Sequence, residues 1–147
     1  MSIGDEPKPS DQKPKVPEGK EKIDLRILVA EDTPDIRDML MILLGRRYTS
    51  VESVEDGLQL VNKLSTPGYT TDFVLTDNTM PNMRGIDAIK RIRDIEHLKT
   101  VPIILYTTDA QDGPLTVEAD KLGAYFLHKP ARSDEIYAAI EKLRTNK

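Results

Sequence analysis

Several residue types on which common functional sites depend are absent or rare in this sequence. The chain of 147 residues contains no cysteine, which excludes a disulfide framework, a thiolate metal site and a cysteine nucleophile. Its only histidines are His97 and His128, so a histidine-rich zinc site is not expected. No apolar run approaches the roughly 20 residues that span a bilayer, and the N-terminus has no apolar core of the signal-peptide kind. We therefore expect a cytoplasmic protein with no membrane partner.

A surplus of positive charge is also absent. The chain has 21 basic and 25 acidic residues and a net charge of −4. Nucleic-acid binding normally depends on a basic patch that neutralises phosphates, so no nucleic-acid partner is expected. The hydrophobic and charged fractions, 38% and 31%, are typical of a globular protein. The length allows one domain with one hydrophobic core.

The first 22 residues differ in composition from the rest. Pro7, Pro9, Pro14 and Pro17 alternate with charged and polar residues, and large apolar residues are nearly absent. Such a segment buries too little apolar surface to offset its ordering entropy. We predict a disordered N-terminal tail over residues 1–22, which is a solvated leader, a tether or a partner-binding arm, followed by a single domain over residues 23–147.

Within that domain, short apolar runs alternate with helical patterns. The five predicted strands are Ile27–Ala30, Val51–Val54, Phe73–Thr76, Val101–Tyr106 and Tyr125–Leu127. Helical apolar stripes cover 36–44, 58–64, 86–95, 115–122 and 136–143. Pro34 suits a first helical turn, Gly45 a helix end and Ser133 an N-cap. Five strand–helix units with strands that are apolar throughout predict an α/β fold, with a parallel sheet covered on both faces.

Polar side chains with chemical potential follow four of the five predicted strands. Glu31-Asp32 follows the first strand and Asp77 the third, while Thr107-Thr108 follows the fourth and Lys129-Pro130 the fifth. In a parallel α/β sheet, ligands bind at the carboxyl ends of the strands. The sequence therefore predicts that three carboxylates, a hydroxyl and an ammonium meet at one edge of the sheet.

This set of groups favours phosphoryl chemistry with a metal ion. Three close carboxylates repel each other unless a cation joins them. An all-oxygen site with few protein ligands suits Mg²⁺, which usually lies beside phosphate. The metal would let Asp77 act as a nucleophile toward a phosphoryl group. Lys129 could pair with the aspartyl phosphate, and Thr107 could donate a hydrogen bond to it.

The sequence around these residues resembles the receiver domain of two-component response regulators. The resemblance covers roughly residues 23 to 144 and rests on the pattern Asp–(x)₃–Pro–x–Met–x–Gly over Asp77 to Gly85, with an acidic pair upstream and Lys-Pro downstream. The separations, 30 residues from Asp77 to Thr107 and 22 from Thr107 to Lys129, agree with that family. The resemblance implies a flavodoxin-like, doubly wound five-stranded parallel sheet.

The resemblance also implies roles for single residues at the acidic site. Asp77 would be the phosphoacceptor. Mg²⁺ would be bound by Glu31, Asp32, Asp77 and the backbone carbonyl of Thr79. Lys129 would bind a phosphoryl oxygen. A Glu-Asp pair in place of Asp-Asp is a common variation of the family.

Further implied roles concern the conformational switch. Thr107 would be the switch hydroxyl, preferred over Thr108 by spacing, and Lys129-Pro130 would be a cis peptide. Phe126 stands at the position of an aromatic switch residue but has no hydroxyl, so its response would depend on packing. Gly113-Pro114 falls where the fourth helix should begin, and Gly123-Ala124 lies one residue closer to the lysine than expected. These departures affect the predicted shape of the fourth helix.

Some of these residues also have plain structural interpretations. Glu31-Asp32 taken alone could be a polar loop that caps a helix. His97 is expected on the surface, His128 in a structural or interfacial role, and Met80 and Met83 in loop packing. Thr79 and Asp109, each two residues after a predicted site residue, would border the path of the hydrolytic water. We predict that these last two set the lifetime of the phosphorylated state.

The leading functional hypothesis is a binding switch. A histidine kinase or phosphotransfer protein would phosphorylate Asp77, and a downstream protein would bind the face made by the fourth helix, fifth strand and last helix. The chain ends soon after Leu143, so we expect a stand-alone monomer or weak dimer, or else a receiver excised from a hybrid kinase or larger regulator. The rival hypotheses are a phosphohydrolase, which would prefer a carboxylate at position 79, and a scaffold that no longer receives phosphate.

Overall fold

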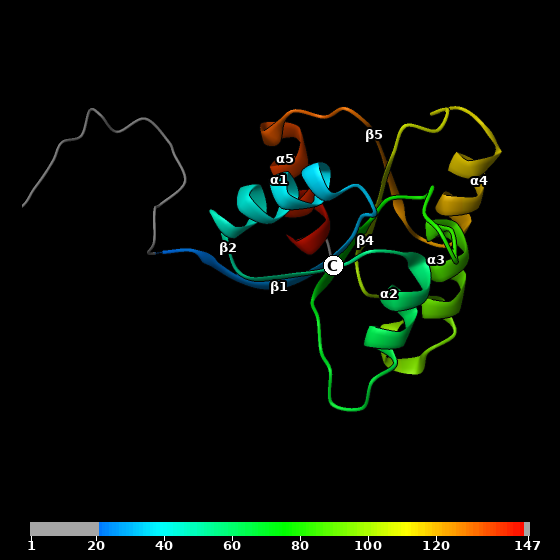
Figure 1. Ribbon diagram of the computed structural model, residues 1–147, viewed down its shortest axis with the longest axis horizontal. Coiled ribbons are helices and arrows are strands. Elements are labelled where there is room, and N and C mark those ends of the chain that lie inside the picture. Colours follow the sequence, from blue (N-terminus) through cyan, green and yellow to red (C-terminus); the bar gives the residue numbers. More distant parts are fainter. Residues whose placement is uncertain (1–20, 146–147) are drawn as a thin grey trace, which may run out of the picture.

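The computed structural model describes residues 21–145. These residues form one five-stranded parallel sheet with the strand order β2-β1-β3-β4-β5 (Figure 1). The strands are β1 Ile23–Ala30, β2 Tyr48–Val54, β3 Phe73–Thr76, β4 Ile103–Thr107 and β5 Tyr125–His128. The helices are α1 Pro34–Gly45, α2 Gly57–Leu64, α3 Gly85–Arg93, α4 Pro114–Lys121 and α5 Ser133–Thr145, with a short 3₁₀ helix η1 at Glu96–Leu98. The predicted α/β class and parallel sheet are confirmed.

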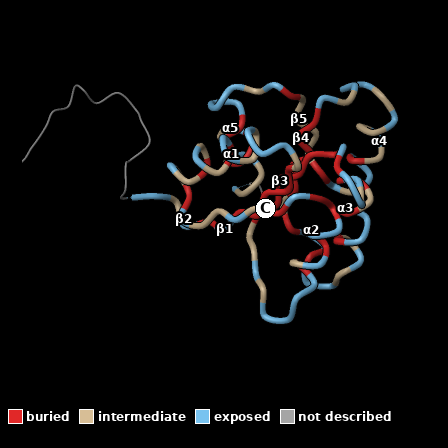
Figure 2. Tube along the Cα trace, viewed as in Figure 1, coloured by how far each residue is buried: buried red, intermediate tan, exposed pale blue. Residues whose placement is uncertain are grey.

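Helices cover both faces of the sheet. Helices α1 and α5 lie on one face, and α2, α3 and α4 lie on the other (Figure 1). Alternate strand residues point to opposite faces, so Leu28 packs with α2 and α3 while its neighbour Val29 packs with α1 and α5. Buried residues concentrate in the central strands and the inner helix faces (Figure 2). The hydrophobic core therefore consists of two layers that the sheet separates.

Strand burial follows position in the sheet. Every residue of β3 and β4 is buried, as predicted for strands covered on both faces. The edge strands β2 and β5 are only partly buried. Strand β2 begins at Tyr48 instead of the predicted Val51, because Tyr48 already pairs with Ile23 at the start of β1. Strand β4 begins at Ile103 instead of Val101 and includes Thr107 as its last residue.

Two helix starts differ from the predictions. Gly113 is the N-cap of α4 and Pro114 occupies its first turn, so the Gly-Pro pair begins the helix and does not disturb it. Helix α5 begins at Ser133 itself, so Ser133 is not the N-cap. The carbonyl of Arg132 accepts from the Glu135 and Ile136 amides, and the Glu135 carboxylate accepts from the Arg132 amide. Arg132 therefore caps the helix through its backbone groups. The identity of its side chain does not predict this role.

The topology positions a site between β1 and β3. From β1 the chain moves outward to β2 and then returns to β3 on the other side of β1. This reversal is a topological switch point, where doubly wound sheets bind ligands. Within residues 21–145, none of the helices combines the length and apolarity required to cross a bilayer. Almost all of the predicted tail, residues 1–20, lies outside the described residues.

Candidate functional site

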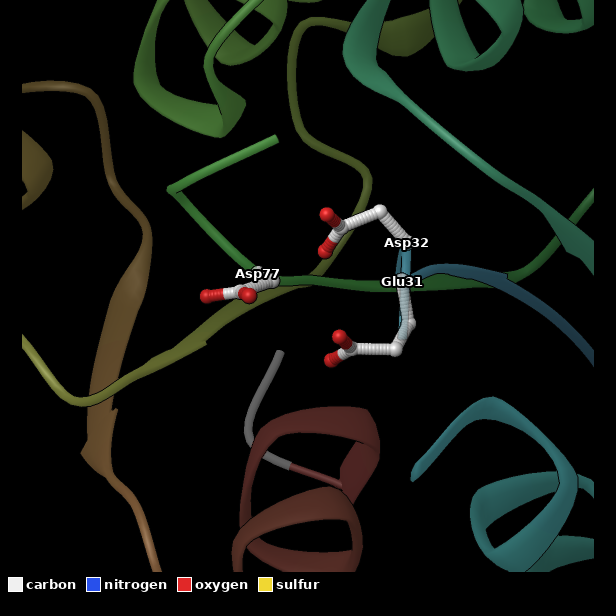
Figure 3. A group of neighbouring side chains, drawn as sticks. All are labelled: Glu31, Asp32 and Asp77. Atoms are coloured by element: carbon white, nitrogen blue, oxygen red, sulfur yellow. The ribbon is translucent and has the colours of Figure 1, made fainter. Parts of the chain in front are cut away.

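Three carboxylates meet where β1 and β3 end. Glu31 and Asp32 directly follow β1, and Asp77 directly follows β3. Each offers an oxygen, and these oxygens lie within 4.8 Å of one another. Figure 3 shows the Glu31 and Asp32 side chains reaching from the end of β1 toward the side of the site where Asp77 lies. Glu31 and Asp77 are buried and Asp32 is half-buried, so the cluster opens to solvent beside Asp32.

A buried lysine joins two of these carboxylates. Lys129 follows β5, and its Nζ lies 2.8 Å from Glu31 Oε1 and 3.3 Å from Asp77 Oδ2. Burial acts to lower the pKa of Lys129, but the hydrogen bonds and charges of the two carboxylates outweigh it, so the pKa is raised. Lys129 is therefore protonated, and its ammonium is positively charged, at neutral pH. The Lys129-Pro130 peptide is cis, as predicted.

The loop after Asp77 is fixed to the N-terminus of α3. The amide of Asn78 donates to Asp77 Oδ1 at 2.7 Å, and the Asn78 side chain accepts from the Ile86 amide at 2.9 Å. Gly85 donates to the Asn78 carbonyl at 2.8 Å. A Cβ at position 85 would overlap the carbonyl oxygen of Asp77, so only glycine permits this approach. The glycine of the sequence motif thus holds Asp77 in place.

The far side of the same loop is attached to α2. Asp56 caps α2 by accepting from the Gln59 amide, and its other oxygen accepts from Asn82 Nδ2 at 2.7 Å. Asn82 has a left-handed backbone with φ of 68°. Gly57 donates to the Met83 carbonyl. Sequence reasoning missed Asp56, although an Asp-Gly pair before a helical stripe is a recognised N-cap signal.

The predicted switch residues are Thr107, the last residue of β4, and Phe126, the second residue of β5. Thr107 is buried and its Oγ1 donates to Asp109 Oδ2 at 2.6 Å, whereas Thr108 is exposed. Phe126 pairs with Leu105 in the β4–β5 register and is partly buried in the layer of α2, α3 and α4. Because Leu105 and Thr107 are two residues apart, Phe126 and Thr107 share one face of the sheet.

Two more predicted site residues differ in exposure from the buried acids. Thr79 is exposed in the loop between β3 and α3, and Asp109 is half-buried in the loop after β4. Sequence reasoning missed Tyr106, whose ring lies 5.3 Å from Lys129 Nζ and whose hydroxyl accepts from the Ala131 amide. A tyrosine in a buried strand gave no signal that its ring lies beside Lys129.

His97 is exposed on η1, as expected for a surface residue.

The donor set fits a divalent cation. Three carboxylates against one ammonium leave an excess of negative charge in a largely buried place, which a cation would compensate. Both oxygens of Glu31 have partners, since Oε2 accepts from the Thr33 amide and Oε1 contacts Lys129. Among residues 21–145, no hydrogen bond or ion pair is found for the Asp32 carboxylate. Asp32 is therefore the carboxylate of the cluster most available to a cation.

Comparison with known proteins agrees with this geometry. Residues 27–141 match the response regulator receiver domain. The chemotaxis protein CheY-3 of Vibrio cholerae is 30% identical over 81% of this chain and 91% of its own length. The CAI-1 autoinducer sensor kinase/phosphatase CqsS of Vibrio cholerae is 34% identical, and the hybrid signal transduction histidine kinase D of Dictyostelium discoideum is 31% identical. The chain spans only 17% and 8% of those two proteins.

Solved structures give the same result. The signal receiver domain of a histidine kinase from Syntrophus aciditrophicus superposes with a TM-score of 0.73 at 27% identity, covering 83% of this chain and 91% of that one. The chemotaxis response regulator CheY4 of Vibrio cholerae gives 0.72 at 26% identity, with coverage of 82% and 99%. Receiver domains act mainly as phosphorylation-dependent signalling switches, interact with histidine kinases or phosphotransfer proteins, and generally bind Mg²⁺ in an acidic pocket. The chain belongs to the response regulator receiver domain family of two-component signalling.

Proposed function

We propose that this chain is a switch that accepts a phosphoryl group on Asp77 from a histidine kinase or phosphotransfer protein. The observation that carries the proposal is the bridge of Lys129 Nζ between Glu31 and Asp77, within a group of three carboxylates. The bridge places a cation beside the proposed nucleophile and leaves an excess of negative charge for a divalent metal. The lysine ammonium and a divalent metal ion are the two cationic partners that a transferred phosphoryl group requires.

The proposed reaction is a direct transfer. An oxygen of Asp77 attacks phosphorus, the new O–P bond forms, and the P–N bond to the donor histidine breaks, so that the imidazole leaves with the electron pair of that bond. Bound Mg²⁺ would neutralise phosphoryl charge, held by Glu31, Asp32, Asp77 and the carbonyl of Thr79. Lys129 contacts Asp77 before transfer and would pair with a phosphoryl oxygen afterwards.

The proposed output is a change of packing at β4 and β5. Phosphorylation would favour a state in which Thr107 and Phe126 move inward. Their shared face of the sheet supports this coupling. The face of α4, β5 and α5 would then change its affinity for a downstream protein. Within this face Val117 on α4 is a large apolar side chain that is 56% exposed, which suits a partner contact.

A labelling experiment tests the proposed chemistry. The chain is incubated with acetyl phosphate and Mg²⁺ and its intact mass is measured. We expect the gain of one phosphoryl group, its loss in Asp77→Asn, and weaker labelling when a chelator removes Mg²⁺. An Asp94→Asn variant, which changes an exposed carboxylate at the end of α3, should label normally. No labelling at any Mg²⁺ concentration would support the scaffold, and many turnovers with small phosphomonoesters would support a phosphohydrolase.

The stand-alone, cytoplasmic and monomeric or weakly dimeric state is a further part of the proposal. Its support is the likeness to CheY-3, whose length this chain nearly spans. The alternative is a receiver that belongs to a hybrid kinase or larger regulator. An immunoblot of soluble and membrane fractions from the source cells, followed by size-exclusion chromatography of the detected species, separates the two. A species much larger than 16.6 kDa in the immunoblot would favour the alternative.

A further inference from the structure

The hydroxyl of Thr107 already has an acceptor. Its Oγ1 donates to Asp109 Oδ2 at 2.6 Å, and the Asp109 amide donates back to Oγ1 at 3.3 Å. Thr107 is almost completely buried, with 1% of its surface exposed. A threonine hydroxyl has one proton to donate. The bond to Asp109 therefore uses the proton that a phosphoryl oxygen on Asp77 would need.

A second residue holds the carboxylate of Asp109. Asn78 Nδ2 donates to the same Oδ2 at 3.3 Å. The orientation of this amide is fixed at its other end, where Asn78 Oδ1 accepts from the backbone N–H of Ile86. Asn78 directly follows Asp77 and is buried. Asp109 is thus tied both to the end of β4 and to the loop that carries the proposed phosphoacceptor.

We propose that Asp109, anchored by Asn78, is a positioning residue that retains the Thr107 hydroxyl until Asp77 is phosphorylated. This inference rests on the proposed phosphorylation of Asp77. A carboxylate and a phosphoryl group are both charged acceptors, so Thr107 exchanges one charge-assisted hydrogen bond for another. The net gain from its bond to the phosphoryl group is the difference between two similar bonds. The retaining contact therefore weakens the contribution of Thr107 to the phosphorylated state.

Simple repulsion would be a different role for Asp109. Its negative charge would oppose a phosphoryl group whether or not Thr107 has a hydroxyl. Retention, in contrast, requires that hydroxyl. The two roles can be separated by a double-mutant cycle, since only retention makes the effect of changing Thr107 depend on the residue at position 109.

The experiment uses the full chain with Mg²⁺ and beryllofluoride, an unreactive mimic of the phosphoryl group. Beryllofluoride affinity is measured by NMR titration for wild type, Thr107→Val, Asp109→Ala and the double variant. We expect Thr107→Val to weaken binding about tenfold more in the Asp109→Ala background than in wild type. Thr108→Val, at the exposed neighbouring hydroxyl, is the matched control and should show no such dependence. Asp109→Leu, which lacks acceptors but has a similar volume, replaces Asp109→Ala if that variant does not fold.

An equal effect of Thr107→Val in both backgrounds overturns the inference and assigns Asp109 to repulsion alone. A second measurement on the protein without beryllofluoride uses three-bond couplings of the Thr107 methyl group, which report its χ1 rotamer. We expect one rotamer in wild type and averaging in Asp109→Ala, and an unchanged single rotamer contradicts retention. If wild type does not bind beryllofluoride, or Asp77→Asn binds it equally well, the proposed function itself fails and the inference with it.

Discussion

The ammonium of Lys129 lies closer to Glu31 than to Asp77, at 2.8 Å against 3.3 Å. Glu31 is therefore the principal partner of the lysine while Asp77 is unmodified. The raised pKa of Lys129 shows that the two carboxylates together outweigh the cost of burial. The lysine thus neutralises part of the negative charge of the acidic cluster.

Removal of this ammonium should make the protein more dependent on Mg²⁺. In Lys129→Met the three carboxylates lose their buried cation, and we expect a loss of about 3 kcal/mol in the free energy of unfolding, because breaking a buried ion pair leaves uncompensated charge. Added Mg²⁺ should raise the melting temperature more in Lys129→Met than in wild type. Lys99→Met, which breaks an exposed pair with Glu96, is the control. An equal Mg²⁺-induced rise in wild type and Lys129→Met would contradict this account.

Gly85→Ala should displace the loop that carries Asp77. The added Cβ would overlap the Asp77 carbonyl oxygen and lie 3.0 Å from Asn78 Cα, so backbone must move. We expect a loss of about 2 kcal/mol in unfolding free energy and slower labelling by acetyl phosphate. Gly45→Ala is the matched control, because a Cβ added there would meet no other part of the protein within 4 Å and alanine favours helix. Unchanged stability and labelling in Gly85→Ala would show that the loop tolerates the shift.

The sequence allowed the strand ends to be predicted because their signals are local. Asp77 and Lys129 each follow a run of apolar residues, and the sheet topology then brings them together. Asn78 could not be recognised in this way, because its role depends on the return of the chain at Ile86. The contact of Asp56 with Asn82 also joins segments far apart in the chain, although the role of Asp56 as an N-cap has a local signal.

Element boundaries were hardest to predict where side chains have little influence. Ser133 has the side chain of an N-cap, but α5 uses the backbone of Arg132 together with Glu135. Tyr48 begins an edge strand whose next two residues, Thr49 and Ser50, are polar and not buried, which hides the start of the strand. The α5 cap is made by local hydrogen bonds that the Arg132 side chain does not signal, and the start of β2 depends on the pairing of Tyr48 with Ile23. The predictions were therefore most reliable for the central strands, where burial dominates.

Arg93 should be essential for joining α3 to the segments that follow it. Its guanidinium donates to four backbone carbonyls, those of Leu98, Val101, Leu122 and Gly123. Burial lowers the pKa of Arg93. In Arg93→Met we expect a loss of about 2 kcal/mol in unfolding free energy from urea titration, because these carbonyls lose their donor. Arg91→Met, on the exposed face of α3, should change little, and equal stabilities of the two variants would contradict this role.

The bond between Tyr48 and Glu141 predicts a pH dependence of stability. Burial acts to raise the pKa of Glu141, but Arg144 and Tyr48 outweigh it, so the pKa is lowered on folding. The stabilising effect of the Glu141 carboxylate is therefore complete above its pKa in the unfolded chain, about 4.3. This effect is lost as the pH falls through the lower pKa of Glu141 in the folded state. The stability difference between wild type and Glu141→Gln should be constant from neutral pH down to about 5 and shrink as the pH falls from about 4.3 through the lower folded pKa. Glu135→Gln, on the same helix, is measured in parallel as the reference variant. A stability difference between wild type and Glu141→Gln that grows on acidification would contradict the prediction.

Thr79 and Asp109 should set the lifetime of the phosphorylated state. The carboxylate of Asp109 accepts hydrogen bonds from Thr107 and from Asn78, the residue after Asp77. Once the Thr107 hydroxyl turns to the phosphoryl group, this carboxylate can orient an attacking water. We expect the combined substitution of alanine at both positions to slow the loss of the phosphoryl group about tenfold, measured by intact mass after removal of acetyl phosphate. Thr108→Ala is the control, and an unchanged rate in the double variant would refute the prediction.

The Thr107→Val background separates two reasons why Asp109→Ala could slow this hydrolysis. Without the carboxylate, a freed Thr107 hydroxyl would hold the phosphoryl group more strongly, and an attacking water would also lose its acceptor. Only the first effect requires the hydroxyl. If Asp109→Ala slows hydrolysis equally with threonine and with valine at position 107, the carboxylate acts on water. If the slowing disappears with valine, retention of the hydroxyl accounts for the lifetime, and Asp109 acts on the phosphate through Thr107.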